Sequence, residues 1–96
     1  MRVARRYLIT GRVQGVGFRV FTEAAALREG LHGWVRNTSA GVEIEAVGDV
    51  EALTRFEHAI AHGPPRARVE RFEVTDLGPD TRETGFSVRV STPWTH

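Results

Sequence analysis

A glycine-rich segment at residues 10–19 is the first place where this sequence could do chemistry: Thr10-Gly11-Arg12-Val13-Gln14-Gly15-Val16-Gly17-Phe18-Arg19. A turn of this kind, leading from a strand into a helix, can aim consecutive backbone N–H groups at one point, where the helix N-terminus adds partial positive charge. Arg19 falls in the first turn of the expected helix, where its guanidinium can bind a phosphate or a carboxylate. The segment predicts an anion site, although its spacing fits neither the Walker pattern nor a dinucleotide fingerprint. A flexible turn followed by an ordinary surface arginine fits the same residues.

Asn37, in the segment Gly33-Trp34-Val35-Arg36-Asn37-Thr38, is the second candidate. Asparagine is depleted in strands, and this chain holds only one Asn and one Gln, so its presence calls for a reason. A right-handed crossover from the first strand would bring Asn37 to the same sheet edge as the glycine-rich segment, where it could face the anion. The alternative is that Asn37 only opens a hairpin turn.

Other side chains that could do chemistry have simpler explanations. His58 and His62 lie four residues apart on an expected helix and could bind a metal, but histidine near a helix end more often complements the helix dipole. Trp34 belongs to the core or lines a substrate pocket. The basic cluster at residues 66–71, together with Glu70 and Glu73, indicates a solvated ion-pair face rather than a nucleic-acid patch; its arginines are Arg66, Arg68 and Arg71.

The elements that must position the candidates follow from hydrophobic periodicity. Alternation predicts strands at 3–13, 31–38, 42–47, 69–77 and 86–90, and helices start at Phe18 and after Asp49 and stop at Gly30 and Gly63. In the first helix, the apolar stripe is expected to be Val20, Ala24, Leu27 and Leu31, with Phe21 and Ala25 beside it. In the second helix, Leu53, Phe56 and Ile60 are expected to face the core. The order is βαββαβ plus a last short strand. This order predicts an α+β fold of the ferredoxin-like split βαβ type, with both helices on one face of a mainly antiparallel sheet.

Composition limits the class of protein. The 96 residues, 41% of them hydrophobic, suffice for one domain spanning 1–96, of which we expect 91–96 to fray. A formal net charge of +1 argues against a nucleic-acid partner, and no run of apolar residues is long enough for a signal peptide or a membrane span. We therefore expect a cytoplasmic protein. The scarcity of amides fits a heat-adapted source, whereas the absence of lysine argues against one and fits a G+C-rich genome instead.

Two stretches resemble the acylphosphatase family. Residues 9–19 are similar to its first signature and residues 33–41 to its second, and the order of elements agrees from about Arg2 to Val90. The resemblance implies a small hydrolase that cleaves the carboxyl–phosphate bond of acyl phosphates, releasing inorganic phosphate. It implies that Arg19 binds the phosphate, that Asn37 positions the attacking water, and that a loop wraps the phosphate; the loop residues are Gln14, Gly15, Val16, Gly17 and Phe18. No cofactor and no metal are expected, and the chain is expected to be a monomer.

This chemistry suits the candidates, because a carboxylate leaving group with a pKa near ~4.3 departs without a proton from the enzyme. An arginine, backbone donors and an oriented water could then suffice. Two other functions remain open. The loop could hold a phosphorylated metabolite without catalysis, as acylphosphatase-like domains do within hydrogenase-maturation proteins. An RNA-binding ferredoxin-like domain is less favoured, because Glu43 and Glu45 stand where base-stacking aromatics would be needed.

Overall fold

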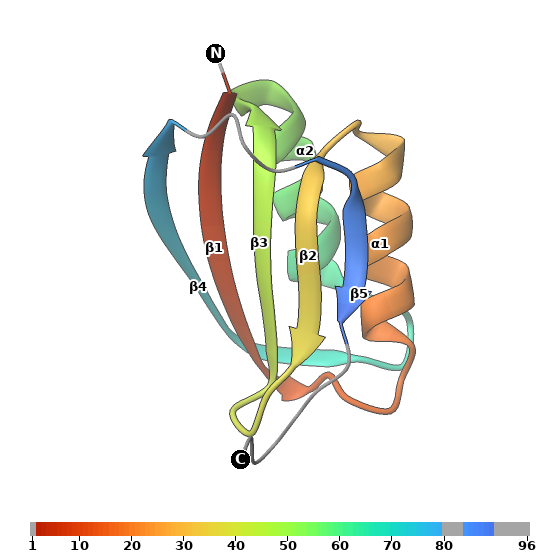
Figure 1. The fold of residues 1–96 in the computed structure, drawn as a ribbon. Helices are drawn as coiled ribbons and strands as arrows, with labels where there is room; N and C mark the ends of the chain where they lie inside the picture. The colour runs from red at the N-terminus through yellow and green to blue at the C-terminus, as the bar shows by residue number, and fades with distance from the viewer. Residues whose placement is uncertain (1, 80–83, 90–96) are drawn as a thin grey trace.

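The computed structural model describes residues 2–79 and 84–89 of the chain. Within them, five strands form one sheet, and two helices lie together on one of its faces (Figure 1). The elements are β1 (Arg2–Arg12), α1 (Phe18–Arg28), β2 (His32–Asn37), β3 (Val42–Asp49), α2 (Val50–His62), β4 (Arg68–Pro79) and β5 (Phe86–Arg89).

The strand order across the sheet is β4-β1-β3-β2-β5. The central strands β1 and β3 pair antiparallel, as do β1 with β4 and β2 with β3, whereas β5 runs parallel to β2 at the edge. The predicted α+β, ferredoxin-like arrangement is therefore confirmed. Because α1 carries the chain from β1 to β2, the glycine-rich segment after β1 and the end of β2 lie at the same edge of the sheet (Figure 1).

The core lies between the sheet and the helices. From the sheet it takes alternate residues of the central strands, such as Tyr7, Ile9 and Ile44, all of which are fully buried. From α2 it takes the expected stripe of Leu53, Phe56 and Ile60. Asp49 is the N-cap residue of α2, as predicted, although its side chain makes no capping hydrogen bond.

The predicted apolar face of α1 is wrong for Val20, Ala24 and Leu27, whereas Leu31, which follows the helix, is buried as expected. Val20 and Leu27 are 66% and 58% exposed, and the residues that α1 buries are Phe18, Thr22, Ala25 and Ala26. These four residues repeat at i, i+4, i+7 and i+8, which is the same helical period in a different phase. Alanine and threonine are small, so this face can approach the sheet closely, and the larger aliphatic residues are left on the outer face. The periodicity was compatible with both faces.

Several expectations fall outside the described residues. Among them are Asp80, in the turn that Gly78-Pro79-Asp80 predicts between the last two strands, Val90 of the last strand, and the tail at 91–96. The frayed tail therefore stays a prediction. In the part of the chain that the structure describes, neither helix is long and apolar enough to cross a membrane.

Candidate functional site

A small pocket lies where β1 runs into α1 and β2 ends. It encloses about 120 Å³. The segment after β1 and the first turn of α1 contribute most of its lining, and the last residue of β2 completes it; the lining residues are Val13, Gly15, Gly17, Phe18, Arg19, Val20 and Asn37. The structure thus brings together the two segments that the sequence singled out, although Arg19 and Asn37 are 18 positions apart in the chain.

The loop between β1 and α1 leaves the helix N-terminus open. Gly15 and Gly17 have φ angles of 73° and 79°, which side chains rarely tolerate, and Gly17 is the N-cap residue of α1. No side chain caps this helix, and its first turn contains no acidic residue. The N–H groups of a first turn have no partner within the helix, so they are available to an anion together with the positive end of the dipole.

Arg19 is held at the first turn of α1 with most of its donors unused. Its Nη1 donates to the backbone oxygen of Arg89 at the end of β5, over 3.2 Å. A guanidinium has five N–H donors. Among the described residues the others find no acceptor, and the side chain is half-buried beside the pocket. The contact with β5 fixes the position of Arg19 and leaves it able to bind an oxyanion.

Asn37 presents an unsatisfied acceptor at this pocket. It is the last residue of β2 and shares the helix-covered face with Val35, two residues before it. Its Oδ1 is buried and has no hydrogen-bond partner in the described part of the chain. A buried polar atom without a partner costs about 1–3 kcal/mol, so this oxygen is placed where a donor from outside the protein would satisfy it.

The five residues predicted to wrap a phosphate fall into two groups. Gly15, Gly17 and Phe18 line the pocket. Gln14 does not, because its side chain turns to the β2–β3 hairpin and donates to the carbonyl oxygens of Thr38 and Gly41, over 2.6 and 2.8 Å. Val16 is also outside the pocket lining and packs against the hydrophobic core. Their side chains fix the loop, and only their backbone could face a ligand.

Sequence reasoning missed two lining residues, Val13 and Val20. Val20 had been assigned to the core, yet it is exposed at the pocket. Its position directly after Arg19 was the available signal, because the next residue in a first helical turn lies beside the same opening. An exposed valine offers an apolar contact next to the anion site.

Trp34 does not line the pocket. It lies on the face of the sheet away from the helices, with the guanidiniums of Arg36 and Arg89 at 5.3 and 4.7 Å from its ring. His58 and His62 are exposed on α2, and no group of three potential metal-ligating side chains occurs within residues 2–79 and 84–89.

Comparisons with known proteins agree with this geometry. A family model for acylphosphatase matches residues 5–88. The chain is 47% identical over 91 residues to an acylphosphatase of Koribacter versatilis, covering 94% of this chain and 81% of that protein. It is 48% identical over 89 residues to an acylphosphatase of Salinibacter ruber, covering 92% of both.

Solved structures show the same similarity in three dimensions. The crystal structure of acylphosphatase from Bacillus subtilis aligns with a TM-score of 0.85 at 39% identity, covering 93% of this chain and 99% of that one. Full-length HypF, crystallised in a phosphate- and nucleotide-bound form, aligns with a TM-score of 0.89 at 32% identity, covering 95% of this chain and 12% of HypF. The fold therefore also occurs as one part of a much longer protein.

Proposed function

The chain belongs to the acylphosphatase family, and we propose that it hydrolyses acyl phosphates with Arg19, Asn37 and the loop at residues 14–18 as its working parts. Arg19 and the backbone N–H groups at the start of α1 hold the phosphoryl group. Asn37 orients the attacking water. The carboxylate leaves without protonation, so no general acid is needed.

The observation that carries this proposal is the unsatisfied Oδ1 of Asn37 at the pocket lined by Arg19 and the loop. A water molecule that donates a hydrogen bond to this oxygen keeps a lone pair free. That lone pair can attack the phosphorus of the bound phosphoryl group. The water oxygen forms a bond to phosphorus as the bond to the carboxylate oxygen breaks, and the carboxylate takes the electron pair. The proton of the water passes to a phosphate oxygen of the substrate. Positioning and charge stabilisation supply the catalysis in such a reaction.

We test the two roles by comparing Arg19→Ala with Asn37→Ala in the hydrolysis of benzoyl phosphate. Arg19 contacts the phosphate in the ground state and the transition state, so its loss should cost roughly 2–4 kcal/mol in kcat/KM and weaken inhibition by inorganic phosphate. Asn37→Ala should lower kcat by on the order of 10²-fold and change phosphate affinity only a few-fold. Lysine should replace Arg19 poorly, because it lacks the planar fork.

Arg28→Ala serves as the control, since Arg28 lies at the other end of α1 and is 63% exposed. Normal turnover by a folded Asn37→Ala variant would show that Asn37 only opens the hairpin turn and does not position the water. Phosphate binding without turnover in the unaltered chain would instead favour a non-catalytic anion-binding module.

We further propose that hydrolysis needs neither a metal nor a titrating side chain. The pocket is lined by one arginine, one amide, glycines and apolar residues, and its lining includes no carboxylate, histidine or cysteine among the described residues. Dialysis against a chelator should therefore leave kcat unchanged, and kcat should stay level across neutral pH. Activity that is lost on chelation and restored by Mg²⁺ or Zn²⁺ would contradict this. The expected monomeric state and cytoplasmic location also stay predictions.

A further inference from the structure

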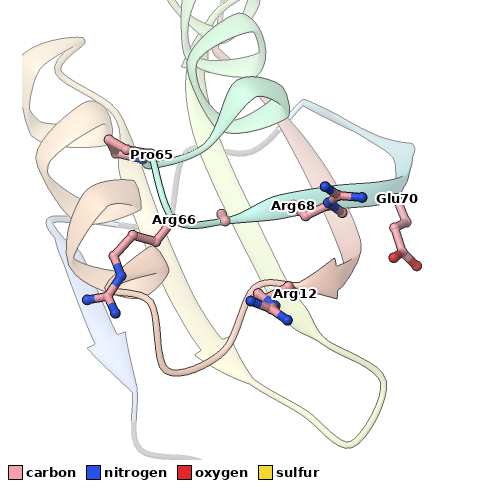
Figure 2. A pocket seen from close by; sticks show the side chains of 6 residues that line it. Arg12, Pro65, Arg66, Arg68 and Glu70 are labelled. Atoms are coloured by element: carbon pink, nitrogen blue, oxygen red, sulfur yellow. The ribbon is translucent and has the colours of Figure 1, made fainter.

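A second cavity lies on the same side of the molecule, between the end of β1 and the start of β4. It has a volume of about 570 Å³ and shares no lining residue with the pocket of Arg19. Arginines dominate its lining, which consists of Arg12, Pro65, Arg66, Ala67, Arg68 and Glu70 (Figure 2). We call this feature the arginine groove. In Figure 2, the carboxylate of Glu70 lies at the far side of the groove from Arg66.

The three guanidiniums of the groove lack partners. Most other arginines of the described chain bind a carboxylate: Arg5, Arg6, Arg36, Arg55 and Arg71 each do so within 3.3 Å. Arg12, Arg66 and Arg68 form no ion pair and no side-chain hydrogen bond within residues 2–79 and 84–89. The ion-pair face expected at residues 66–71 is thus confirmed for Arg71 with Glu73 and wrong for Arg66 and Arg68, which leave their charge unneutralised.

The backbone places two of these arginines side by side. Arg12 and Arg68 are direct cross-strand partners in the β1–β4 ladder. Like charges in that relation are destabilising. The two strands approach closely at this point, because a Cβ on the preceding Gly11 would overlap the carbonyl oxygen of Arg68. A like-charged pair on adjacent strands, with a third arginine lining the same groove and no carboxylate of the described residues paired to any of them, is an arrangement that a bound anion would stabilise.

We propose that the arginine groove is a second anion site, which binds the chain of adjacent phosphates in a small polyphosphate. The three guanidiniums come from the end of β1, the α2–β4 connection and the start of β4, so they can contact successive phosphates of one ligand. Nucleic acid fits less well, because no aromatic residue lines the groove to stack a base. The shared ligand chemistry is the phosphate chain itself, whether free or carried by a nucleotide.

Calorimetric titration of the full chain with inorganic triphosphate tests this site. We expect Arg66→Gln and Arg68→Gln each to weaken binding by about tenfold or more, since each removes charged hydrogen bonds. The matched control is Arg71→Gln, which removes the same charge from the same strand but from a residue already paired with Glu73. Arg19→Ala should retain triphosphate binding, because the groove and the candidate catalytic pocket are separate.

Thermal unfolding gives a second readout. Without ligand, Arg68→Gln should raise Tm by a few degrees, because it removes the repulsion with Arg12. It should also reduce the rise in Tm that triphosphate produces in the unaltered protein, in line with the weaker binding. Arg66 is exposed in the α2–β4 connection, so Arg66→Gln reports on binding without an expected effect on folding.

Three outcomes would overturn the proposal. If Arg71→Gln weakened triphosphate binding as much as the groove variants do, the loss of affinity would be due to net charge alone. If only Arg19→Ala lost triphosphate binding, the triphosphate would bind in the candidate catalytic pocket. Tighter binding of a single-stranded oligonucleotide through the same arginines would show that the groove binds nucleic acid rather than a small polyphosphate. Comparison of triphosphate with ATP then identifies the source, since equal affinities indicate a free polyphosphate and tighter ATP binding indicates a nucleotide.

Discussion

At the scale of single residues, Gln14 joins the two halves of the candidate site. It belongs to the loop that leads to Arg19, and its amide group binds the hairpin that follows Asn37. One Nε2 donates to both the Thr38 and the Gly41 carbonyl oxygens. The hairpin is also closed by a backbone hydrogen bond of 2.8 Å from Thr38 N to Gly41 O. The side chain of Gln14 therefore ties the candidate phosphate-binding loop directly to the hairpin that follows Asn37.

Replacing Gln14 should loosen this connection without removing any group that we expect to touch the substrate. We predict that Gln14→Ala lowers kcat/KM for benzoyl phosphate by on the order of tenfold, because misplacement by even 1 Å can cost more than that. Gln14→Glu should be at least as damaging, since a carboxylate offers no N–H to the two carbonyl oxygens. Steady-state kinetics measure both, with the exposed hairpin residue Ser39→Ala as the control. Full activity in Gln14→Glu would show that the hydrogen bonds from Gln14 to the hairpin have no positioning role.

At the scale of the elements, close backbone contacts fix how the strands meet. Gly33 lies within β2 with a φ of 132°, and a Cβ there would overlap the carbonyl oxygen of Glu45 on β3. This approach sets the register of the strand that ends in Asn37. Gly30, before β2, has a φ of 70° but faces open space. Gly33 is therefore required both for its positive φ and for the close contact between strands, whereas Gly30 is required for its positive φ alone.

We predict that Gly33→Ala destabilises the fold by about 3 kcal/mol or more, because it combines backbone strain with a clash between strands. Gly30→Ala carries only the strain and should cost about 1–2 kcal/mol. Urea unfolding of the two variants measures the difference, provided that their m-values agree. Equal costs would mean that β2 and β3 can move apart at Gly33.

The elements also show what the sequence could and could not predict. The alternation in β3 is compatible with only one buried face, and so is the apolar stripe in α2, which consists of Leu53, Phe56 and Ile60. The buried faces of these two elements were therefore predicted correctly. In α1 two faces shared the same period, and hydrophobicity favoured the wrong one. The motifs placed Arg19 and Asn37 at one edge. The partners of Gln14, 24 and 27 residues away, depend on the hairpin's position in space, which no local pattern contains.

At the scale of the whole molecule, a partly buried polar cluster ties the sheet to α2. Glu57 of α2 accepts a hydrogen bond of 2.8 Å from the Tyr7 hydroxyl and one of 2.6 Å from Arg5, both on β1. Tyr7 is fully buried, at the centre of the core. Burial, and then the hydrogen bond to Glu57, raise the pKa of Tyr7 far above its ordinary value. The phenol therefore stays neutral in the folded state at a pH where an unfolded tyrosine ionises.

This difference makes the stability of the whole chain fall at high pH. Above about pH 10 the unfolded state loses the tyrosine proton and the folded state keeps it, so unfolding becomes more favourable by up to roughly 1.4 kcal/mol per pH unit. The chain contains one tyrosine, no cysteine and no lysine, so Tyr7 is the only side chain whose ordinary pKa lies near 10.

Tyr7→Phe isolates this effect. At pH 7 we predict that it costs about 1.5–3 kcal/mol, because it removes a hydrogen bond to a charged group. Between pH 10 and 12, however, the free energy of unfolding of the variant should fall much less steeply than that of the unaltered protein. Urea unfolding at half-unit steps of pH measures both curves, and they should converge as the pH rises. A decline of the same steepness in Tyr7→Phe would mean that the alkaline loss of stability arises elsewhere, and that Tyr7 is not held neutral by its burial and by Glu57.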